Sequence, residues 1–255
     1  DAPAGDNPFA TSRRIPAAQM PLRQPAGLAM SPAGLPAWSD LRGQVVVRMV
    51  NETEVELVAG TWDTHGDEGD GGDAAASKLD APSGVAYDAA GNLYVVATSN
   101  LRVRKIALDG TITTVAGIGR TQALSKLLGG YKAGSEEGAD ATTALLLAPT
   151  AITFDAEGNM YVAELGTEKA DALITAETPI PIPAELFPKI LPRVRKISPD
   201  GKITTVVGPG SRLLTGENGD DALGVPTGLL IDGEGRLIIA DGFSNQIRII
   251  PAGAY

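Results

Sequence analysis

Several residue types that support common chemistries are scarce or missing in this chain of 255 residues. It contains no cysteine, which excludes disulfide bonds and thiolate metal sites. It has a single histidine, His65, which excludes a zinc site built from several imidazoles. A Ser-His-Asp triad would have to use His65 on a glycine-flanked loop, where nothing orients the ring. We therefore expect no catalytic residues of these kinds.

Positive charge is also in short supply, with 21 Lys and Arg residues against 31 Asp and Glu residues and a formal net charge of −10. Affinity for nucleic-acid phosphates and for anionic membranes depends on clustered Lys and Arg. The charge balance therefore argues against a nucleic-acid partner and against an anionic membrane surface. No apolar run approaches the roughly 18 residues that a membrane-spanning helix needs, so we expect no transmembrane segment.

The start of the chain is polar and has no initiator Met, since it reads Asp1-Ala2-Pro3-Ala4-Gly5-Asp6. A start of this kind is typical of a mature chain whose leader has been removed, or of an expression boundary. We expect a periplasmic or secreted protein.

Glycine and proline, by contrast, are abundant, with 31 and 18 residues, and they punctuate a long internal repeat. The segment RVRKIALDGTITTVAG at 102–117 is repeated almost unchanged as RVRKISPDGKITTVVG at 193–208. Sliding the sequence along itself gives four units, and the fourth stops after its third segment. The units start at Pro25, Pro82, Pro149 and Pro226.

Each unit has the pattern of four short β-strands. In the second unit these are GVAYD at 84–88, NLYVVA at 92–97, RVRKIAL at 102–108 and TITTVAG at 111–117. Asp109-Gly110 between the last two is a strong hairpin signal, and β-branched residues fill the strands. An ordinary open meander is one interpretation. Four-stranded units repeated in series favour a β-propeller, because each small sheet buries its faces only against neighbouring blades.

The phrases PSGVAYDAAGNLYV at 82–95, RVRKIxxDGxITTVAG and GDGGDA at 69–74 resemble the NHL repeat of β-propellers. The resemblance covers residues 25–255 and implies an all-β propeller domain. The family usually closes with five or six blades, whereas four are recognisable here. We therefore expect the ring to be incomplete, or to be completed by the N-terminal extension 1–24 or by another chain. Within that extension, SRRIPAAQM at 12–20 is the predicted closing strand beside the fourth unit.

An acidic loop, DTHGDEGDGGD at 63–73, offers Asp67, Asp70 and Asp73 as Ca²⁺ ligands, because hard cations prefer several carboxylate and carbonyl oxygens. The spacing is not that of an EF-hand, since no Glu stands at its twelfth position. A solvated acidic loop is the simpler interpretation. Asp73 and Asp140 both precede Ala, which suggests a capping role within the repeat. We expect no cofactor, with Ca²⁺ as the alternative.

The resemblance also implies where an enzyme of this fold would hold its metal. A gluconolactonase-like site needs Glu, Asn and Asp converging on the ring axis, and Asn100, Glu164 and Asp241 are the candidates. Asn and Asp are equally routine as turn formers. We expect no enzyme, and therefore expect alanine at His65, Glu164 or Asp241 to leave the fold intact. A metal-assisted lactonase or lyase is the alternative function.

Four arginines recur at identical repeat positions, namely Arg102, Arg104, Arg193 and Arg195. NHL propellers are known to bind RNA, and arginines would suit that use. Recurrence at fixed positions among many acidic residues instead indicates structural pairing with Asp or Glu. We adopt the structural interpretation.

The third unit carries an apolar insertion, residues 165–192, which is 24 residues longer than the matching stretch 98–101 of the second unit. Its five prolines favour an extended segment whose backbone stays free for partners. One interpretation is that it folds back over its own blades. The other, which we adopt, is a binding or scaffold module that docks a protein partner or another subunit through this insertion and a propeller face. The predicted contact residues are Leu173, Ile174, Ile180, Ile182, Leu186, Phe187, Ile190 and Leu191.

Overall fold

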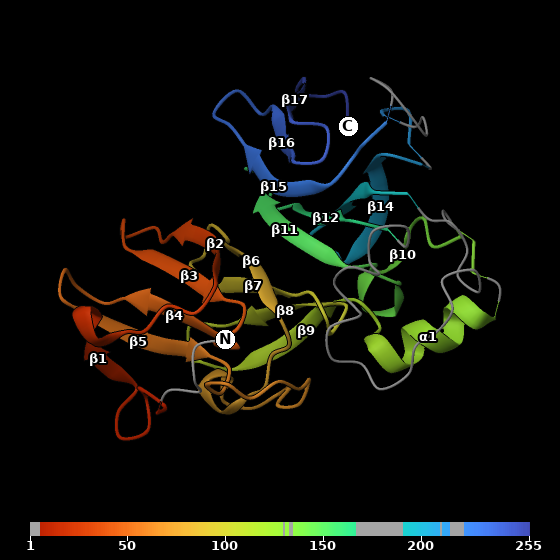
Figure 1. The fold of residues 1–255 in the computed structure, drawn as a ribbon. Helices are drawn as coiled ribbons and strands as arrows, with labels where there is room; N and C mark the ends of the chain where they lie inside the picture. The colour runs from red at the N-terminus through yellow and green to blue at the C-terminus, as the bar shows by residue number, and fades with distance from the viewer. Residues whose placement is uncertain (1–5, 130, 133–134, 167–190, 210, 215–221) are drawn as a thin grey trace. The chain divides into compact units, whose positions relative to one another are not determined.

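A computed structural model of the chain describes residues 6–129, 131–132, 135–166, 191–209, 211–214 and 222–255 (Figure 1). The regular structure in these ranges is mostly β-strand, arranged as four antiparallel sheets, which confirms the predicted all-β fold. The chain divides into two compact units, residues 1–114 and 115–255. Among the described residues, no helix is both long and apolar enough to cross a membrane.

The first unit holds the first two sheets of the repeat. The strand order in the first sheet is β1-β5-β4-β3-β2, and in the second it is β6-β7-β8-β9, whose last residues pass into the second unit. The elements are β1 (Arg14–Pro16), 3-10 helix η1 (Ala17–Gln19), β2 (Pro25–Met30), β3 (Pro36–Asp40), β4 (Val45–Met49), β5 (Glu54–Ala59), 3-10 helix η2 (Ala74–Ala76), β6 (Pro82–Tyr87), β7 (Leu93–Ala97), β8 (Arg102–Ile106) and β9 (Ile112–Ala116).

The N-terminal extension contributes a strand, but not where the sequence predicted it. β1 pairs antiparallel with β5 of the first sheet, with Ile15 opposite Val55, rather than with the fourth sheet. The reason is burial, because Ile15 and Phe9 join the apolar cluster that contains Val55 and Leu57. The expected closing strand therefore serves as a fifth strand on the first sheet.

The second unit holds the third and fourth sheets, with strand orders β10-β14-β13-β12-β11 and β15-β16-β17. The fourth sheet has three strands among the described residues, in line with a fourth repeat that ends after its third segment. A short helix, α1, was not predicted, although its sequence RTQALSKLL is rich in good helix formers. The elements are α1 (Arg120–Leu128), β10 (Ala139–Asp140), 3-10 helix η3 (Ala141–Thr143), β11 (Pro149–Phe154), β12 (Met160–Glu164), β13 (Arg193–Ile197), β14 (Lys202–Val207), β15 (Pro226–Ile231), β16 (Leu237–Asp241) and β17 (Gln246–Ile250).

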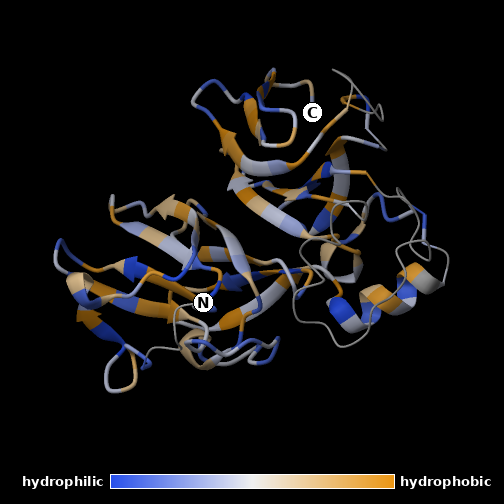
Figure 2. Cartoon of the chain, in the orientation of Figure 1, coloured by the Kyte–Doolittle hydropathy of each residue, from blue (hydrophilic) through white to orange (hydrophobic). Residues whose placement is uncertain are grey.

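Within each unit the apolar core lies between two consecutive sheets. In the first unit, Ala37 and Val46 of the first sheet pack with Val85 and Val95 of the second. In the second unit, Tyr161 of the third sheet belongs to one cluster with residues of β16 and β17. Apolar residues recur along the strands of the sheets, with more hydrophilic residues between them (Figure 2). Small sheets cannot bury two faces alone, so this stacking is what stabilises the repeat.

The first hairpin of the second and third sheets contains the same polar motif. Asp88 accepts hydrogen bonds from the Asn92 backbone N–H (2.8 Å), the Asn92 Nδ2 (2.7 Å) and the Tyr94 hydroxyl (3.1 Å). Asp155 accepts the equivalent three from Asn159 and Tyr161. Burial opposes ionisation of both aspartates, but these hydrogen bonds outweigh it and hold each pKa below its usual value.

We expect the double substitution Asp88→Asn/Asp155→Asn to reduce the loss of stability on acidification. Both carboxyls have a lower pKa in the folded chain than the roughly 3.9 of an unfolded Asp. Their stabilisation is therefore present above that value and disappears as the pH falls through the folded pKa. Urea midpoints measured at neutral and at acid pH should differ less for the double variant than for wild type. Glu157→Gln, which removes an exposed carboxylate from the same turn as Asp155, should behave like wild type. An equal acid loss in the double variant and wild type would contradict this assignment.

Candidate functional site

Each sheet has a polar side chain at or just beyond the end of its second strand, and an oxygen of this side chain binds the segment that leads into the first strand. In all four sheets it accepts a hydrogen bond from the backbone N–H two residues before the leading proline. The pairs are Arg23 N to Asp40 Oδ2 (2.8 Å), Asp80 N to Asn100 Oδ1 (3.1 Å), Leu147 N to Glu164 Oε2 (2.9 Å) and Gly224 N to Asp241 Oδ2 (3.0 Å). The contact ties the incoming chain to the sheet.

Three of these acceptors are the residues that the sequence nominated around a metal, Asn100, Glu164 and Asp241. Each is 5 % exposed or less. Asn100 belongs to the first unit and the two carboxylates to the second, and each is bonded to its own sheet. For Asp241, burial opposes ionisation, but the backbone N–H groups of Gly224 and Val225 outweigh it and lower the pKa. The structure thus gives all three a structural role.

Asp40, the fourth acceptor, was missed because the first repeat copy is degenerate, with LPAWSDLRGQVVVRMV at 35–50 in place of the usual strand sequences. Its signal was nevertheless present, since Asp40 ends the second strand of its sheet as Glu164 and Asp241 end theirs. The Asp40 carboxylate also accepts hydrogen bonds from the backbone N–H groups of Gln24 (3.0 Å) and Gly43 (2.8 Å). Across the described ranges, no group of three or more His, Asp and Glu side chains is arranged to hold a metal ion.

The repeated arginines bind the same incoming segment from the third strand. A guanidinium nitrogen donates to the backbone carbonyl four residues before the leading proline in the second, third and fourth sheets. The pairs are Arg104 to Lys78 (3.0 Å), Arg193 to Leu145 (3.3 Å) and Arg248 to Ala222 (2.7 Å). These acceptors are backbone carbonyls, whereas the prediction was pairing with Asp or Glu; Arg102, Arg104 and Arg193 also make such ion pairs, with Asp67, Asp70 and Glu164.

The Ca²⁺ candidates are part of the same arrangement. Asp67 pairs with Arg102 at 3.2 Å and Asp70 with Arg104 at 2.6 Å. Asp73 pairs with Arg13 and caps η2 by accepting from the Ala75 N–H at 3.1 Å. The capping role predicted for Asp73 is present, whereas Asp140 precedes η3 without a side-chain cap. Two of the three carboxylates are thus paired with repeat arginines, so in this structure their partners are guanidinium groups.

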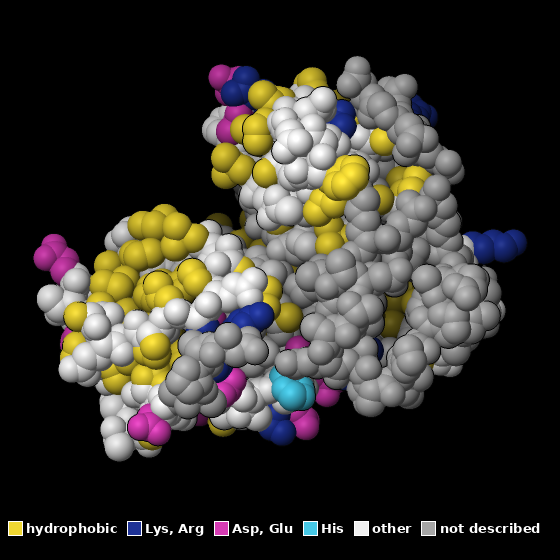
Figure 3. Space-filling model, in the orientation of Figure 1, with side chains coloured by type: hydrophobic (Ala, Val, Ile, Leu, Met, Phe, Trp, Pro, Cys, Tyr) yellow, Lys and Arg dark blue, Asp and Glu magenta, His cyan; other side chains and the backbone are white. Residues whose placement is uncertain are grey.

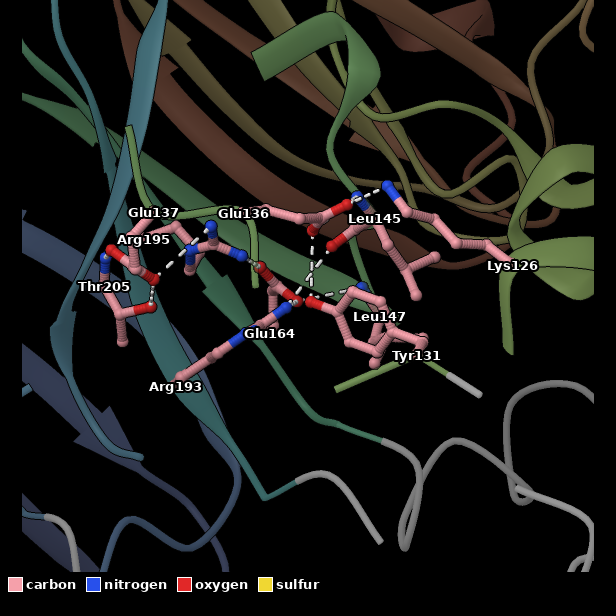
Figure 4. A network of polar contacts seen from close by, with 10 residues as sticks. All are labelled: Lys126, Tyr131, Glu136, Glu137, Leu145, Leu147, Glu164, Arg193, Arg195 and Thr205. Atoms are coloured by element: carbon pink, nitrogen blue, oxygen red, sulfur yellow. Dashed lines mark hydrogen bonds and ion pairs between the residues drawn. The ribbon is translucent and has the colours of Figure 1, made fainter. Parts of the chain in front are cut away.

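The most unusual polar cluster lies where the inner strands β12 and β13 of the third sheet meet, around Glu164 (Figure 4). Glu164 is fully buried and lies between two arginines that are each 1 % exposed, Arg193 and Arg195. Its Oε2 accepts from Arg193 Nη2 at 3.1 Å. Burial opposes the charge of Arg193, but the charge of Glu164 and the nearby Tyr131 outweigh it and raise its pKa.

A second carboxylate, Glu136, fixes the segment that follows α1. It accepts hydrogen bonds from the Leu145 N–H (3.0 Å) and the Tyr131 hydroxyl (3.1 Å), and it pairs with Lys126. Glu137 beside it accepts from the backbone N–H (2.7 Å) and hydroxyl (2.6 Å) of Thr205. The sequence places Glu136 and Glu137 among the acidic residues of the second crossing loop, but it does not predict these contacts, because the connection is irregular and the repeat supplies no register there.

Arg195 is the exception in this cluster. The equivalent Arg104 donates to a carbonyl, but in the third sheet Arg193 has taken that role. Arg195 lies 3.7 Å from Glu164 and 3.9 Å from Glu137, too far for hydrogen bonds, and its Nε, Nη1 and Nη2 have no hydrogen-bond partner among the described residues. Burial lowers the pKa of its guanidinium. Buried donors of this kind are normally satisfied by ordered water.

This cluster is poorly suited to catalysis. Its charges balance in pairs, and Glu164, Arg193 and Arg195 are closed off from solvent. The single histidine, His65, is exposed on its loop. Seven of the eight predicted partner-contact residues lie outside the described residues, and the eighth, Leu191, is half-buried.

Comparison with protein-family models identifies an NHL domain. The model of the Teneurin NHL domain matches residues 3–173, about two thirds of the chain. None of the curated proteins matches the chain significantly.

Solved structures share the fold at low sequence identity. A putative gluconolactonase gives a TM-score of 0.56 at 12 % identity, covering 96 % of this chain and 67 % of its own. A streptogramin B lyase gives 0.52 at 10 % identity, covering 93 % and 55 %. An auxiliary nutrient-binding protein from Bacteroides ovatus gives 0.52 at 14 % identity, covering 89 % and 48 %. The chain thus spans between about half and two thirds of the length of these structures.

Proposed function

This chain belongs to the Teneurin NHL-domain family, and from its geometry we propose that it is a non-enzymatic binding or scaffold module of an exported complex. The observation that carries the proposal is that the candidate site residues already make hydrogen bonds to the protein backbone. Asn100, Glu164 and Asp241 are each buried and accept a hydrogen bond from the backbone segment that leads into their own sheet. Side chains committed in this way are not available to bind a substrate or a metal.

The second candidate function is a metal-assisted lactonase or lyase, favoured by the fold shared with a gluconolactonase and a lyase. One fold supports many functions, so this likeness alone decides nothing. Metal analysis after exhaustive dialysis and a lactone-hydrolysis assay separate the two candidates. The binding module should retain no stoichiometric Ca²⁺ or Zn²⁺ and should not exceed the background rate. Retained metal, together with turnover abolished by Asp241→Asn, would establish the enzyme instead.

We assign partner docking to the insertion 165–192. Its two ends are neighbours across a finished pair of strands, because Glu164 of β12 lies opposite Arg193 of β13. In the second sheet the same positions, Ala97 and Arg102, are joined by four residues only. A long apolar insertion at such a junction is not needed to connect the strands, and long insertions of this kind are usually functional surface loops.

Deletion of residues 167–190 should give a folded chain that no longer captures a partner. The remaining residues 165–166 and 191–192 form a four-residue connection, equal in length to 98–101. Leu165 is retained because it is 4 % exposed and its N–H donates to Ala148. Loop-closure entropy changes slowly with length, so the melting temperature should shift by only a few degrees.

A second variant separates loop length from apolar contact. Seven residues of the insertion are replaced by Ser at full length, and capture by this variant should also be lost. These residues are Leu173, Ile174, Ile180, Ile182, Leu186, Phe187 and Ile190. Pull-down from an extracellular extract, with wild type as the reference, is the readout. An unfolded deletion variant would show that the segment belongs to the core, and undiminished capture by both variants would exclude it as the docking element.

A further inference from the structure

The first sheet exposes apolar side chains that correspond to buried positions in the other sheets. Leu28 and Met30 of β2 are 70 % and 56 % exposed. They stand three and five residues after the leading proline. In the fourth sheet those positions are Leu229 and Ile231, which pack into the cluster shared with the third sheet. Leu28 and Met30 therefore lie on the face with which a sheet of this repeat packs against the sheet before it.

The fourth sheet exposes the opposite face. Leu230, Ile247 and Ile249 are 54 %, 64 % and 55 % exposed. The register places Leu230, Ile238 and Ile249 in one row across β15, β16 and β17, with Ala240 and Ile247 in the next. In the first sheet the counterpart of Leu230 is Ala29, which packs against the cluster shared with the second sheet. The exposed residues thus form the face that packs against the following sheet.

Figure 3 shows hydrophobic side chains at the surface over both of these sheets. Beside the exposed row, residues of the β16–β17 hairpin line an open hollow of about 220 Å³, among them Ala240, Asn245 and Ile247. Contiguous apolar surface of this kind is uncommon on soluble monomers and marks interfaces.

We propose that a second copy of this chain covers these faces, with the first sheet of one copy packed on the fourth sheet of the other. The chain itself supplies both halves of the contact, and it makes the same contact internally between its first and second sheets and between its third and fourth. Two copies carry eight sheets, which lies within the range of known propellers. The proposal is independent of the function proposed above, since it concerns self-association and not partner binding.

A hydrogen bond supports the same pairing. Between the third and fourth sheets, the Thr150 hydroxyl donates to the Pro226 carbonyl at 2.6 Å. The counterpart of Thr150 in the fourth sheet is Thr227, which is exposed and contacts Ala240 of its own sheet at 3.3 Å. The counterpart of Pro226 in the first sheet is Pro25. The pairing would therefore place the Thr227 hydroxyl against the Pro25 carbonyl of the second copy.

Light scattering coupled to size exclusion tests the proposal on the full chain. Wild type should run at twice the 26.2 kDa mass of one chain. Leu230→Lys/Ile249→Lys and Leu28→Lys/Met30→Lys each place charges in the contact without touching the core, and each should weaken the dimer at least about 100-fold. The matched control is Leu108→Lys, at a leucine that is 76 % exposed on the β8–β9 turn, and it should remain a dimer.

Mixing the two double variants gives the decisive result. Each variant keeps the face that the other has lost, so a head-to-tail contact predicts that the mixture recovers a dimer that neither variant forms alone. A monomeric wild type would overturn the proposal, because the faces would then be covered within one chain or by some other protein. A dimer that persists in either double variant would overturn it as well. Circular dichroism spectra of both double variants should match that of wild type, which shows that loss of the dimer is not caused by unfolding.

Discussion

Alanine in place of Glu164 is expected to lower the free energy of unfolding by about 3–5 kcal/mol, the usual loss when one member of a buried charge pair is removed. The carboxylate is fully buried, and its removal leaves Arg193 and Arg195 as uncompensated buried charges. It also leaves the Leu147 N–H without its acceptor. For a domain of this size, the melting temperature should fall by roughly 10 °C.

The measurement is thermal and urea unfolding of Glu164→Ala, with Glu157→Ala as the control. Glu157 is an exposed carboxylate on the same sheet, and its replacement should change stability by no more than about 0.5 kcal/mol. A loss below about 1 kcal/mol for Glu164→Ala would show that water, rather than the carboxylate, compensates the two arginines. From the sequence alone, alanine at Glu164 was expected to leave the fold intact. The structure leads to the opposite expectation, because Glu164 is buried and balances the charges of two buried arginines.

The second large effect is expected at Arg104, where alanine should cost about 2–3 kcal/mol. Its guanidinium is fully buried and donates to the carbonyls of Lys78 (3.0 Å) and Glu68 (3.3 Å), as well as to Asp70. Removal deprives the Lys78 carbonyl of this donor and loosens the loop that crosses to the second sheet, whereas the Glu68 carbonyl keeps the Lys78 N–H at 3.2 Å. Because Asp70 is 42 % exposed, water can solvate its carboxylate, so the loss should stay below that of Glu164→Ala.

Arg102 provides a matched control two residues away on the same strand. It pairs with Asp67 at 3.2 Å; the Arg102 side chain is 19 % exposed and that of Asp67 is 51 % exposed, and an ion pair open to solvent on one side contributes about 0–1 kcal/mol. In urea unfolding, Arg104→Ala should therefore lose clearly more unfolding free energy than Arg102→Ala. Equal losses for the two would show that the crossing loop does not depend on the buried guanidinium.

The repeat made the sheets predictable from the sequence. Alternation of apolar residues, the Asp-Gly turn and the recurring leading proline each act over a few residues, so local pattern locates the strands. Even the degenerate first copy, PAWSD and VVVRM, forms the expected strands β3 and β4. At the same repeat position, Arg102 pairs with Asp67 and Arg193 pairs with Glu164, so the local pattern indicates an acidic partner for the arginine but does not identify it.

The roles of individual residues depended on contacts that the sequence does not encode locally. Glu164 looked like a turn residue or a metal ligand, and only the approach of Leu147 and Arg193 shows it to be a buried cap. Arg195 matches Arg104 in sequence, yet Arg193 takes over its carbonyl contact and leaves its guanidinium without a hydrogen bond.

The sequence by itself determined the all-β class, the number of repeats and the approximate positions of the repeat strands, because strand formation follows short-range alternation and turn chemistry. Only the tertiary structure decided that the N-terminal strand joins β5, that Asn100, Glu164 and Asp241 bind backbone N–H groups, and that Leu28 and Leu230 stay exposed. These outcomes depend on which sheet lies next to which. The burial of a side chain and the identity of its partner depend on that packing, and the sequence pattern of one strand does not specify which sheet packs against it.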